Sequence, residues 1–174
     1  TDLVVAGHWG PLAVFTHTGS GWRRAENNGL QGSDGWWNCI EVVDIDQDGD
    51  LDLLAGNWGL NSKFRATAET PITLYRSDFD QNGSVEPLVT YYHNGVETPF
   101  ASRDELGKQM PFLNKKFRTY RSFAGATLEE LFGREALRSA DKKHVYELRS
   151  CVFLNEGEGN FRKIPLPAIG QSSI

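Results

Sequence analysis

The sequence predicts a mainly β protein built from four-stranded antiparallel units, with a small helical insertion. Short apolar segments of alternating polarity recur along the chain, and two acidic loops each join a neighbouring pair of them. Two helix-capping patterns set the middle of the chain apart. We therefore expect strands with both acidic loops at residues 1–98, the helical insertion at residues 99–149, and closing strands at residues 150–174.

The first acidic loop, Asp44–Asp52, carries a carboxylate at every second position and places Gly49 sixth. Five carboxylates so close together repel one another unless a cation neutralises them. Oxygens at positions one, three, five and nine can converge on one centre, and the glycine permits the sharp turn. The loop therefore predicts a calcium site with Asp44, Asp46, Asp48 and Asp52 as ligands. A solvated acidic turn is the alternative, but it would not require strict alternation around a glycine.

The segments beside this loop are strand-like. An EF-hand needs a glutamate at position twelve between two helices, and position twelve here is Ala55. Residues 39–43 and 53–56 are short, apolar and partly β-branched, which is typical of strands. The loop is therefore expected to join two adjacent strands of one sheet.

A second loop, Asp78–Glu86, repeats the spacing with Gly83 in sixth position. An asparagine and a glutamate replace two of the aspartates, so this loop carries less charge. It predicts a weaker calcium site, and an ordinary Asn-Gly hairpin turn is the alternative. The candidate ligands are Asp78, Asp80, Asn82, Ser84 and Glu86.

Bulk properties narrow the possible partners. The 174 residues carry a net charge of -5, which does not favour nucleic acid, and no apolar run is long enough to span a membrane. Cys39 and Cys151 lie far apart in strand-like segments, so we expect two buried thiols. The alternative is a disulfide between them, if the compartment is oxidising.

Internal repeats indicate the architecture. Residues 2–10 resemble residues 52–59, and residues 12–22 resemble residues 151–161. In order, these pieces form one four-stranded unit: strand, acidic loop, strand, strand, Gly-rich turn, strand. Such units arranged radially make a β-propeller, and this chain has about one and a half blades. Open blade edges predict self-association, because unpaired strand edges are templates for pairing.

These motifs resemble a known family. The loop Asp-x-Asp-x-Asp-Gly-x-x-Asp, the strand end Ala-Gly-Asn-Trp-Gly and the turn Phe-Leu-Asn-x-Gly-x-Gly-x-Phe are similar to FG-GAP or VCBS repeats of integrin-alpha-type β-propellers. The resemblance covers residues 1–98 and 150–174, and it implies that the carbonyl of Asp50 joins the first calcium site. It also implies binding, adhesion or scaffolding with a protein or carbohydrate ligand. Because such calcium loops bind too weakly for the cytosol, we expect an extracellular, cell-surface or periplasmic location.

The insertion shows capping boxes at residues 102–105 and 127–130, which predict two or three short helices. Between them, Lys115–Arg121 interleaves cations with aromatic residues. One interpretation is a contact surface for an anionic or sugar ligand. The interpretation we favour is an amphipathic segment with Phe117 and Tyr120 buried.

The sequence favours a non-enzymatic protein. Trp9, Trp36 and Trp37 are expected to be core wedges, whereas Trp58 is a candidate for stacking on a sugar. The histidines are scattered, and no catalytic motif appears. The alternative function is a calcium-dependent polysaccharide lyase. A cleft that places His93 or Tyr91 beside two cations would favour that alternative.

Overall fold

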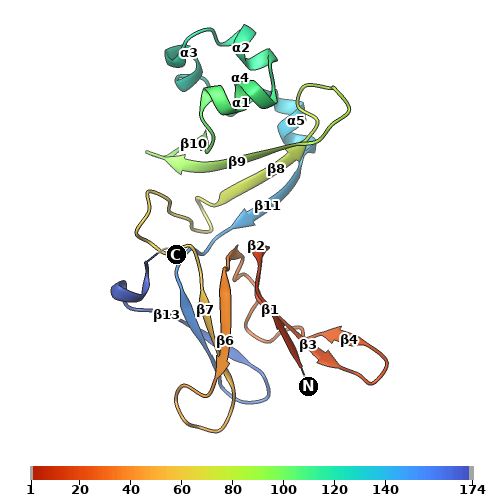
Figure 1. Cartoon of the computed structure of the whole chain (residues 1–174), viewed down its shortest axis with the longest axis vertical. Coiled ribbons are helices and arrows are strands. Elements are labelled where there is room, and N and C mark those ends of the chain that lie inside the picture. Colours follow the sequence, from red (N-terminus) through yellow and green to blue (C-terminus); the bar gives the residue numbers. More distant parts are fainter. Residues whose placement is uncertain (1, 173–174) are drawn as a thin grey trace. The chain divides into compact units, whose positions relative to one another are not determined.

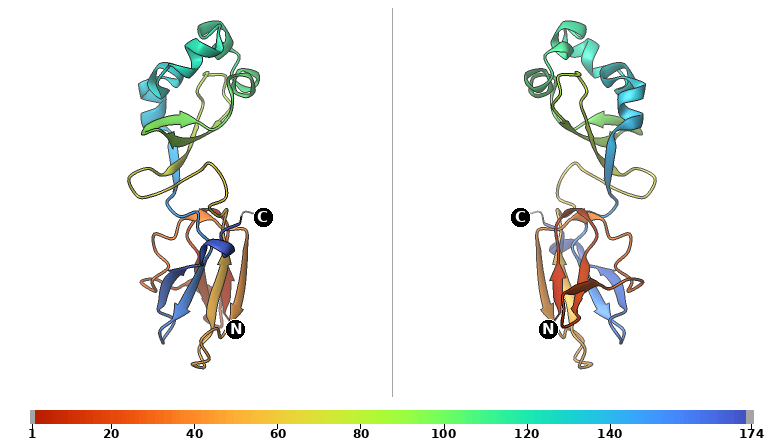
Figure 2. Two further views of the ribbon diagram at one scale, coloured as in Figure 1. Left: turned by 90° about the vertical axis from the view of Figure 1, so that its left-hand side faces the viewer. Right: turned by 90° about the vertical axis from the view of Figure 1, so that its right-hand side faces the viewer.

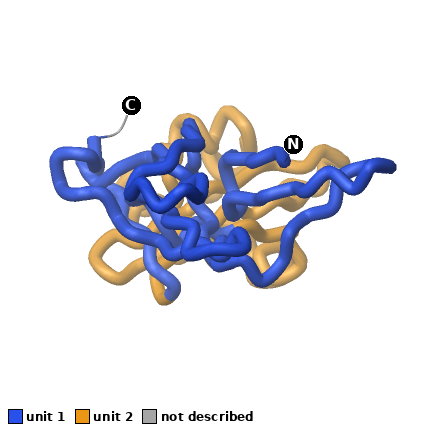
Figure 3. The backbone as a smooth tube through the Cα atoms, turned by 90° about the horizontal axis from the view of Figure 1, so that it is seen from below, with its two compact units in different colours: residues 1–68, 144–174 blue, residues 69–143 orange. Residues whose placement is uncertain are grey.

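The computed structural model describes residues 2–172 and is mainly β, with 35% strand and 18% helix. The chain divides into two compact units (Figure 3). Unit 1 comprises residues 1–68 and 144–174, and unit 2 comprises residues 69–143. Each unit has its own core.

Unit 1 contains three antiparallel sheets (Figure 1). The first has the order β1-β3-β4, the second β13-β12-β7-β6, and the third β2-β5. The bounds are β1 Leu3–Val5, β2 His8–Gly10, β3 Ala13–His17, β4 Trp22–Arg24, β5 Gly35–Trp36, β6 Cys39–Val43, β7 Asp52–Gly56, β12 Cys151–Asn155 and β13 Phe161–Pro165, with a 3-10 turn at Ala168–Gly170. The strands expected on either side of the first acidic loop are thus β6 and β7.

The two larger sheets repeat one pattern of pairing. In β1 and β3, Leu3 pairs with Phe15, and in β7 and β12, Leu53 pairs with Phe153. Strands β1, β3 and β4 therefore correspond to β7, β12 and β13 of the four-stranded sheet. The sequence comparison of residues 12–22 with residues 151–161 aligns Phe15 with Leu154, whereas in the structure Phe15 corresponds to Phe153, one residue earlier. The Gly-rich turn after β3 is one residue shorter than the turn after β12.

The core of unit 1 lies between these two sheets. Leu53, Ala55 and Phe153 of the four-stranded sheet belong to a buried cluster, against which Val4 and Val14 of the other sheet pack. These inward positions follow the alternation of a strand, in which every second side chain faces the same way.

Unit 2 combines a four-stranded antiparallel sheet with five short helices (Figure 2). The sheet has the order β10-β9-β8-β11. Its strands are β8 Ile72–Ser77, β9 Glu86–His93, β10 Val96–Pro99 and β11 Asp141–Val145, and the helices are α1 Arg103–Gln109, α2 Phe112–Lys116, α3 Tyr120–Ala124, α4 Leu128–Phe132 and α5 Arg134–Ser139. Tyr75 and Leu88 of the sheet share a core with Leu106, Leu131 and other helical side chains.

Capping explains where these helices begin. The boxes expected at Ser102 and Thr127 are both present, each with a glutamate side chain bonded back to the cap. A third box pairs Thr119 with Ser122 and starts α3. The insertion therefore contains more helices than the two or three that the sequence predicts.

The boundary of the inserted unit also differs from the expectation. We expected the second acidic loop to belong with the first, at residues 1–98, and the insertion to span residues 99–149. In the structure the second loop lies in unit 2, which spans residues 69–143. The reason is strand pairing, since β8 and β9 pair with each other and with β11 and β10. All sheets formed by residues 2–172 are open, and the propeller arrangement remains a prediction.

Candidate metal centres

The first acidic loop joins β6 to β7 in unit 1 (Figure 1). It brings three carboxylates together. Oxygens of Asp44, Asp46 and Asp48 lie within 4.8 Å of one another. The chain turns inward through two left-handed residues, Gln47 (φ 64°) and Gly49 (φ 99°). Backbone N–H groups hold the carboxylates: Gly49 donates to Asp44 Oδ2 (3.2 Å), Asp48 to Asp46 Oδ1 (3.3 Å) and Asp50 to Asp48 Oδ1 (2.9 Å).

The second loop, between β8 and β9 of unit 2, has the same geometry. Its left-handed residues are Gln81 (φ 59°) and Gly83 (φ 90°), at the same positions as in the first loop. The N–H groups of Gly83, Asn82 and Ser84 donate to Asp78 Oδ2 (2.9 Å), Asp80 Oδ1 (3.2 Å) and Asn82 Oδ1 (2.7 Å). Oxygens of Asp78, Asp80 and Glu86 lie within 4.8 Å of one another. The two loops therefore repeat one local fold, which an ordinary Asn-Gly hairpin turn would not require.

One atom of the first loop lacks a partner. Asp44 Oδ1 is shielded from solvent, and it is the single buried side-chain oxygen or nitrogen of residues 2–172 that has no hydrogen-bond partner. An unpaired buried carboxylate oxygen is costly, and a bound cation would remove that cost. The donor set also fits a hard cation, because it consists of oxygens alone.

The charges in the first loop affect one another. Desolvation, with the nearby charge of Asp48, raises the pKa of Asp46 above its ordinary value. A proton on Asp46 would remove one of these charges, whereas a cation bound by several carboxylates would neutralise more of them.

A model of the FG-GAP-like repeat family matches residues 1–55. This similarity is confined to residues 1–55. The match includes the whole first loop and ends inside β7, before the second loop. Searches of curated proteins and of solved structures each returned no significant match. No helix within residues 2–172 is long and apolar enough to cross a membrane.

The ninth residue of the first loop has a second role. Asp52 is fully buried, and its Oδ2 accepts the N–H of Ile45 at 2.8 Å. Its Oδ1 accepts the N–H of Asn155 at 2.8 Å, so Asp52 ties the loop to β12. Asp52 is outside the three-carboxylate group, although a carboxylate retains lone pairs after two such bonds. In the second loop the corresponding residue, Glu86, does lie with the group.

Of the tryptophans expected in the core, Trp37 belongs to the buried cluster of unit 1, Trp36 is buried outside that cluster, and Trp9 is only partly buried. Trp36 makes edge-on contacts with Trp9 and Trp58, both at 5.3 Å between ring centroids. Trp58 is partly buried, and its Nε1 donates to Ser62 Oγ at 3.1 Å. This packing accounts for Trp58 without a sugar ligand.

In the segment Lys115–Arg121 of unit 2, one of the two aromatic residues expected to be buried lies on the surface. Phe117 is partly buried and packs on Phe123, but Tyr120 is 64% exposed, so the expectation of a buried Tyr120 is wrong. The Tyr120 hydroxyl donates to Asp104 Oδ2 at 2.6 Å, and the Arg103 guanidinium lies over its ring. The helix N-terminus at Thr119 turns Tyr120 outward, where these two partners hold it.

The cleft that contains His93 does not meet the condition set for a lyase. It has a volume of about 570 Å³, and of the described residues that line it, one is an arginine or lysine, namely Arg103. That guanidinium is already paired with Asp104 at 3.1 Å and bonded to the carbonyl of Phe117. The cleft therefore offers no free pair of cations beside His93.

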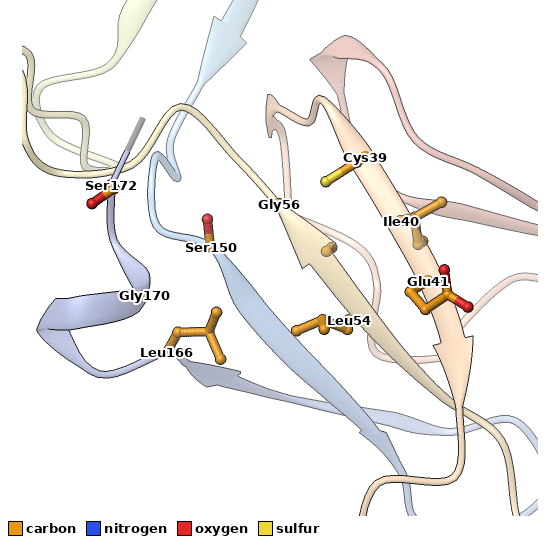
Figure 4. A pocket seen from close by; sticks show the side chains of 10 residues that line it. Cys39, Ile40, Glu41, Leu54, Gly56, Ser150, Leu166, Gly170 and Ser172 are labelled. Atoms are coloured by element: carbon orange, nitrogen blue, oxygen red, sulfur yellow. The ribbon is translucent and has the colours of Figure 1, made fainter. Parts of the chain in front are cut away.

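Both cysteines are free thiols, and only one is buried. Cys151 is fully buried, whereas Cys39 is exposed, which corrects the expectation for Cys39. Cys39 lies beside a shallow pocket of about 300 Å³ (Figure 4), lined also by Leu54, Leu166 and Ser150. The described residues that line the pocket also include Glu41, and none of them is a histidine.

Sequence reasoning missed a polar cluster in unit 1 centred on Asn57 and Glu147. Asn57 is fully buried, and its Oδ1 accepts the N–H groups of Trp36 (3.0 Å) and Trp58 (2.8 Å). Its Nδ2 donates to the carbonyl of Glu147 at 2.9 Å. The sequence did contain a signal for this cluster, because Asn57 directly follows the apolar strand end Ala55-Gly56. An asparagine buried at that position needs hydrogen-bond partners for its side chain.

Proposed function

We propose that this protein is a calcium-binding module in which the Asp44 loop of the FG-GAP-like repeat holds one Ca²⁺. The observation that carries the proposal is Asp44 Oδ1, which is buried and has no other partner. Asp44, Asp46, Asp48, the carbonyl of Asp50 and Asp52 would supply the oxygens. The second loop would hold another Ca²⁺ with Asp78, Asp80, Asn82, the carbonyl of Ser84 and Glu86.

Calcium suits these loops better than its competitors. Zinc prefers nitrogen and sulfur ligands, and neither loop contains histidine or cysteine. Magnesium demands a tight octahedron and keeps several waters, whereas calcium tolerates many carboxylates in a flexible loop. The left-handed glycine of each loop supports this, because it lets the chain wrap around a centre.

Calcium would act here by holding strands in register. The first loop connects β6 to β7, and Asp52 connects it to β12. Neutralising the carboxylates would therefore stabilise three strands of one sheet. We propose that the resulting rigid β unit serves in ligand binding, adhesion or scaffolding, with its two repeated sheets as consecutive blades. An extracellular, cell-surface or periplasmic location is part of the proposal, because calcium is abundant there.

The test is thermal unfolding with and without calcium. At about 100 times its dissociation constant, a ligand adds roughly 2.7 kcal/mol to the free energy of unfolding. Calcium should therefore raise the Tm, and Asp46→Ala should remove most of the rise that belongs to unit 1.

Asp50→Ala is the matched control. It removes the same charge from the loop but keeps the backbone carbonyl, so it should retain calcium binding. Equal loss in both variants would show that charge alone matters and that the proposed coordination is wrong. Calorimetry should also detect a second, weaker site that Asp80→Ala removes.

A further inference from the structure

The two loops differ at their second position. Ile45 of the first loop is 41% exposed. Phe79 of the second loop is 7% exposed, and its ring packs on Phe132 of α4 with 5.3 Å between centroids. The same backbone fold therefore points one side chain outward and the other into the core of unit 2.

Phe79 connects the acidic group to that core. Its N–H donates to Glu86 Oε2 at 2.9 Å, and Glu86 is only 4% exposed. Glu86 is also one of the three carboxylates gathered in the loop. On the other side, the Phe79 ring belongs to the apolar cluster that contains Leu88, Leu131 and Phe132.

Repulsion in the loop would act on this connection. Carboxylates held within 4.8 Å repel one another, and burial of Glu86 reduces the screening by water. Without a cation, a shift of Glu86 away from Asp78 and Asp80 would relieve this repulsion. Because Glu86 holds the Phe79 backbone, that movement would pull the Phe79 ring away from α4.

We propose that Phe79 couples calcium binding at the second loop to the ordering of α4 and α5. Phe79 is then a positioning residue that sets calcium affinity although it supplies no oxygen. The inference rests on the proposed calcium binding of the second loop. Coupling is reciprocal, so the metal stabilises the helical core and the helical core strengthens metal binding by the same factor.

Hydrogen exchange on the unaltered protein tests the first half of the proposal. The amides of Leu131 and Gly133, which bond to the carbonyls of Thr127 and Glu129, report on α4. Calcium should slow their exchange by about tenfold, within the usual range of coupling between sites. The same experiment on Asp80→Ala should show no slowing, because the second site is removed while the first remains.

Affinity measurements test the second half. In an Asp46→Ala background, calorimetry follows the second loop alone, and Phe79→Ala should weaken its calcium binding about tenfold. The matched control is Ile45→Ala in an Asp80→Ala background, which should leave the affinity of the first loop unchanged. If Phe79→Ala fails to fold, Phe132→Ala replaces it, with Leu113→Ala of α2 as a core control that should weaken binding less.

The outcomes separate the two proposals. Absence of calcium at the second loop overturns both the proposed function of that loop and the coupling. Calcium binding to the second loop without slower exchange in α4 overturns the coupling alone. Equal weakening by Phe132→Ala and Leu113→Ala also overturns it, because the effect would then reflect general loss of stability.

Discussion

Replacing Glu147 with glutamine should destabilise unit 1 at neutral pH and have little effect in acid. The buried Glu147 carboxylate accepts hydrogen bonds from Arg149 Nε and Nη2, both at 2.8 Å, and from Lys163 Nζ at 2.9 Å. Burial alone would raise the pKa of Glu147, but these bonds outweigh it and hold the pKa at about 2. Glutamine would turn an N–H₂ group toward one of the cations and leave it unpaired.

The pKa of Glu147 sets the size of the effect. Its ordinary value is 4.5, and each pH unit of difference corresponds to 1.36 kcal/mol, so the upper limit is roughly 3 kcal/mol. The Arg149 and Lys163 side chains are 43% and 33% exposed, and water screens part of their attraction. We therefore expect Glu147→Gln to cost about 1–2 kcal/mol at pH 7.

The sign of the pH dependence follows from the lowered pKa. A carboxyl group with a depressed folded-state pKa contributes its full stability above pH 4.5 and loses it as the pH falls toward 2. The difference between the two proteins should shrink over that window. Urea unfolding followed by tryptophan fluorescence measures it, because all five tryptophans lie in unit 1 with Glu147. A difference under about 0.5 kcal/mol at pH 7, or one that is unchanged at pH 3, would refute this account.

Two further perturbations test the packing of unit 1. Gly35→Ala would place a Cβ 2.7 Å from Asn57 Nδ2, so it should cost about 2–4 kcal/mol in urea unfolding, and a cost near zero would contradict the packing. Iodoacetamide at pH 8 should label Cys39 but not Cys151 in the folded protein, because burial raises the Cys151 pKa to about 12, and mass spectrometry would reveal equal labelling if Cys151 were accessible.

The sequence contained the local features of this fold. Alternating polarity located β6 and β7 on either side of the first loop, and capping patterns located α1 and α4. Both signals are local. A helix cap forms hydrogen bonds within three residues, and the side chains of a strand alternate between its two faces. The spacing of oxygens around Gly49 and Gly83 likewise predicted two loops of one geometry, which the backbone angles confirm.

The sequence could not predict which strands pair when they lie far apart along the chain. The segments that form β8 and β9 alternate in polarity as any half-buried strand does, and nothing local says that they pair with β11 and β10 instead of with β7. For the same reason the sequence could not assign Cys39 to the exposed face of an edge strand. The sequence predicted a buried Tyr120. Its hydrogen bond joins α3 to Asp104 of α1, sixteen residues away, and no local pattern predicts that contact.

The insertion of unit 2 between two paired strands affects the order of folding. Ala55 of β7 pairs with Cys151 of β12, so an unfolded chain must close a loop of about 96 residues to form that pairing. Once unit 2 has folded, β8 and β11 lie side by side, and the free chain left to close shrinks to about 20 residues. The saving in loop-closure entropy is roughly 1.4 kcal/mol, or about tenfold in rate. The inserted unit thus speeds the closure of a sheet to which it contributes no strand.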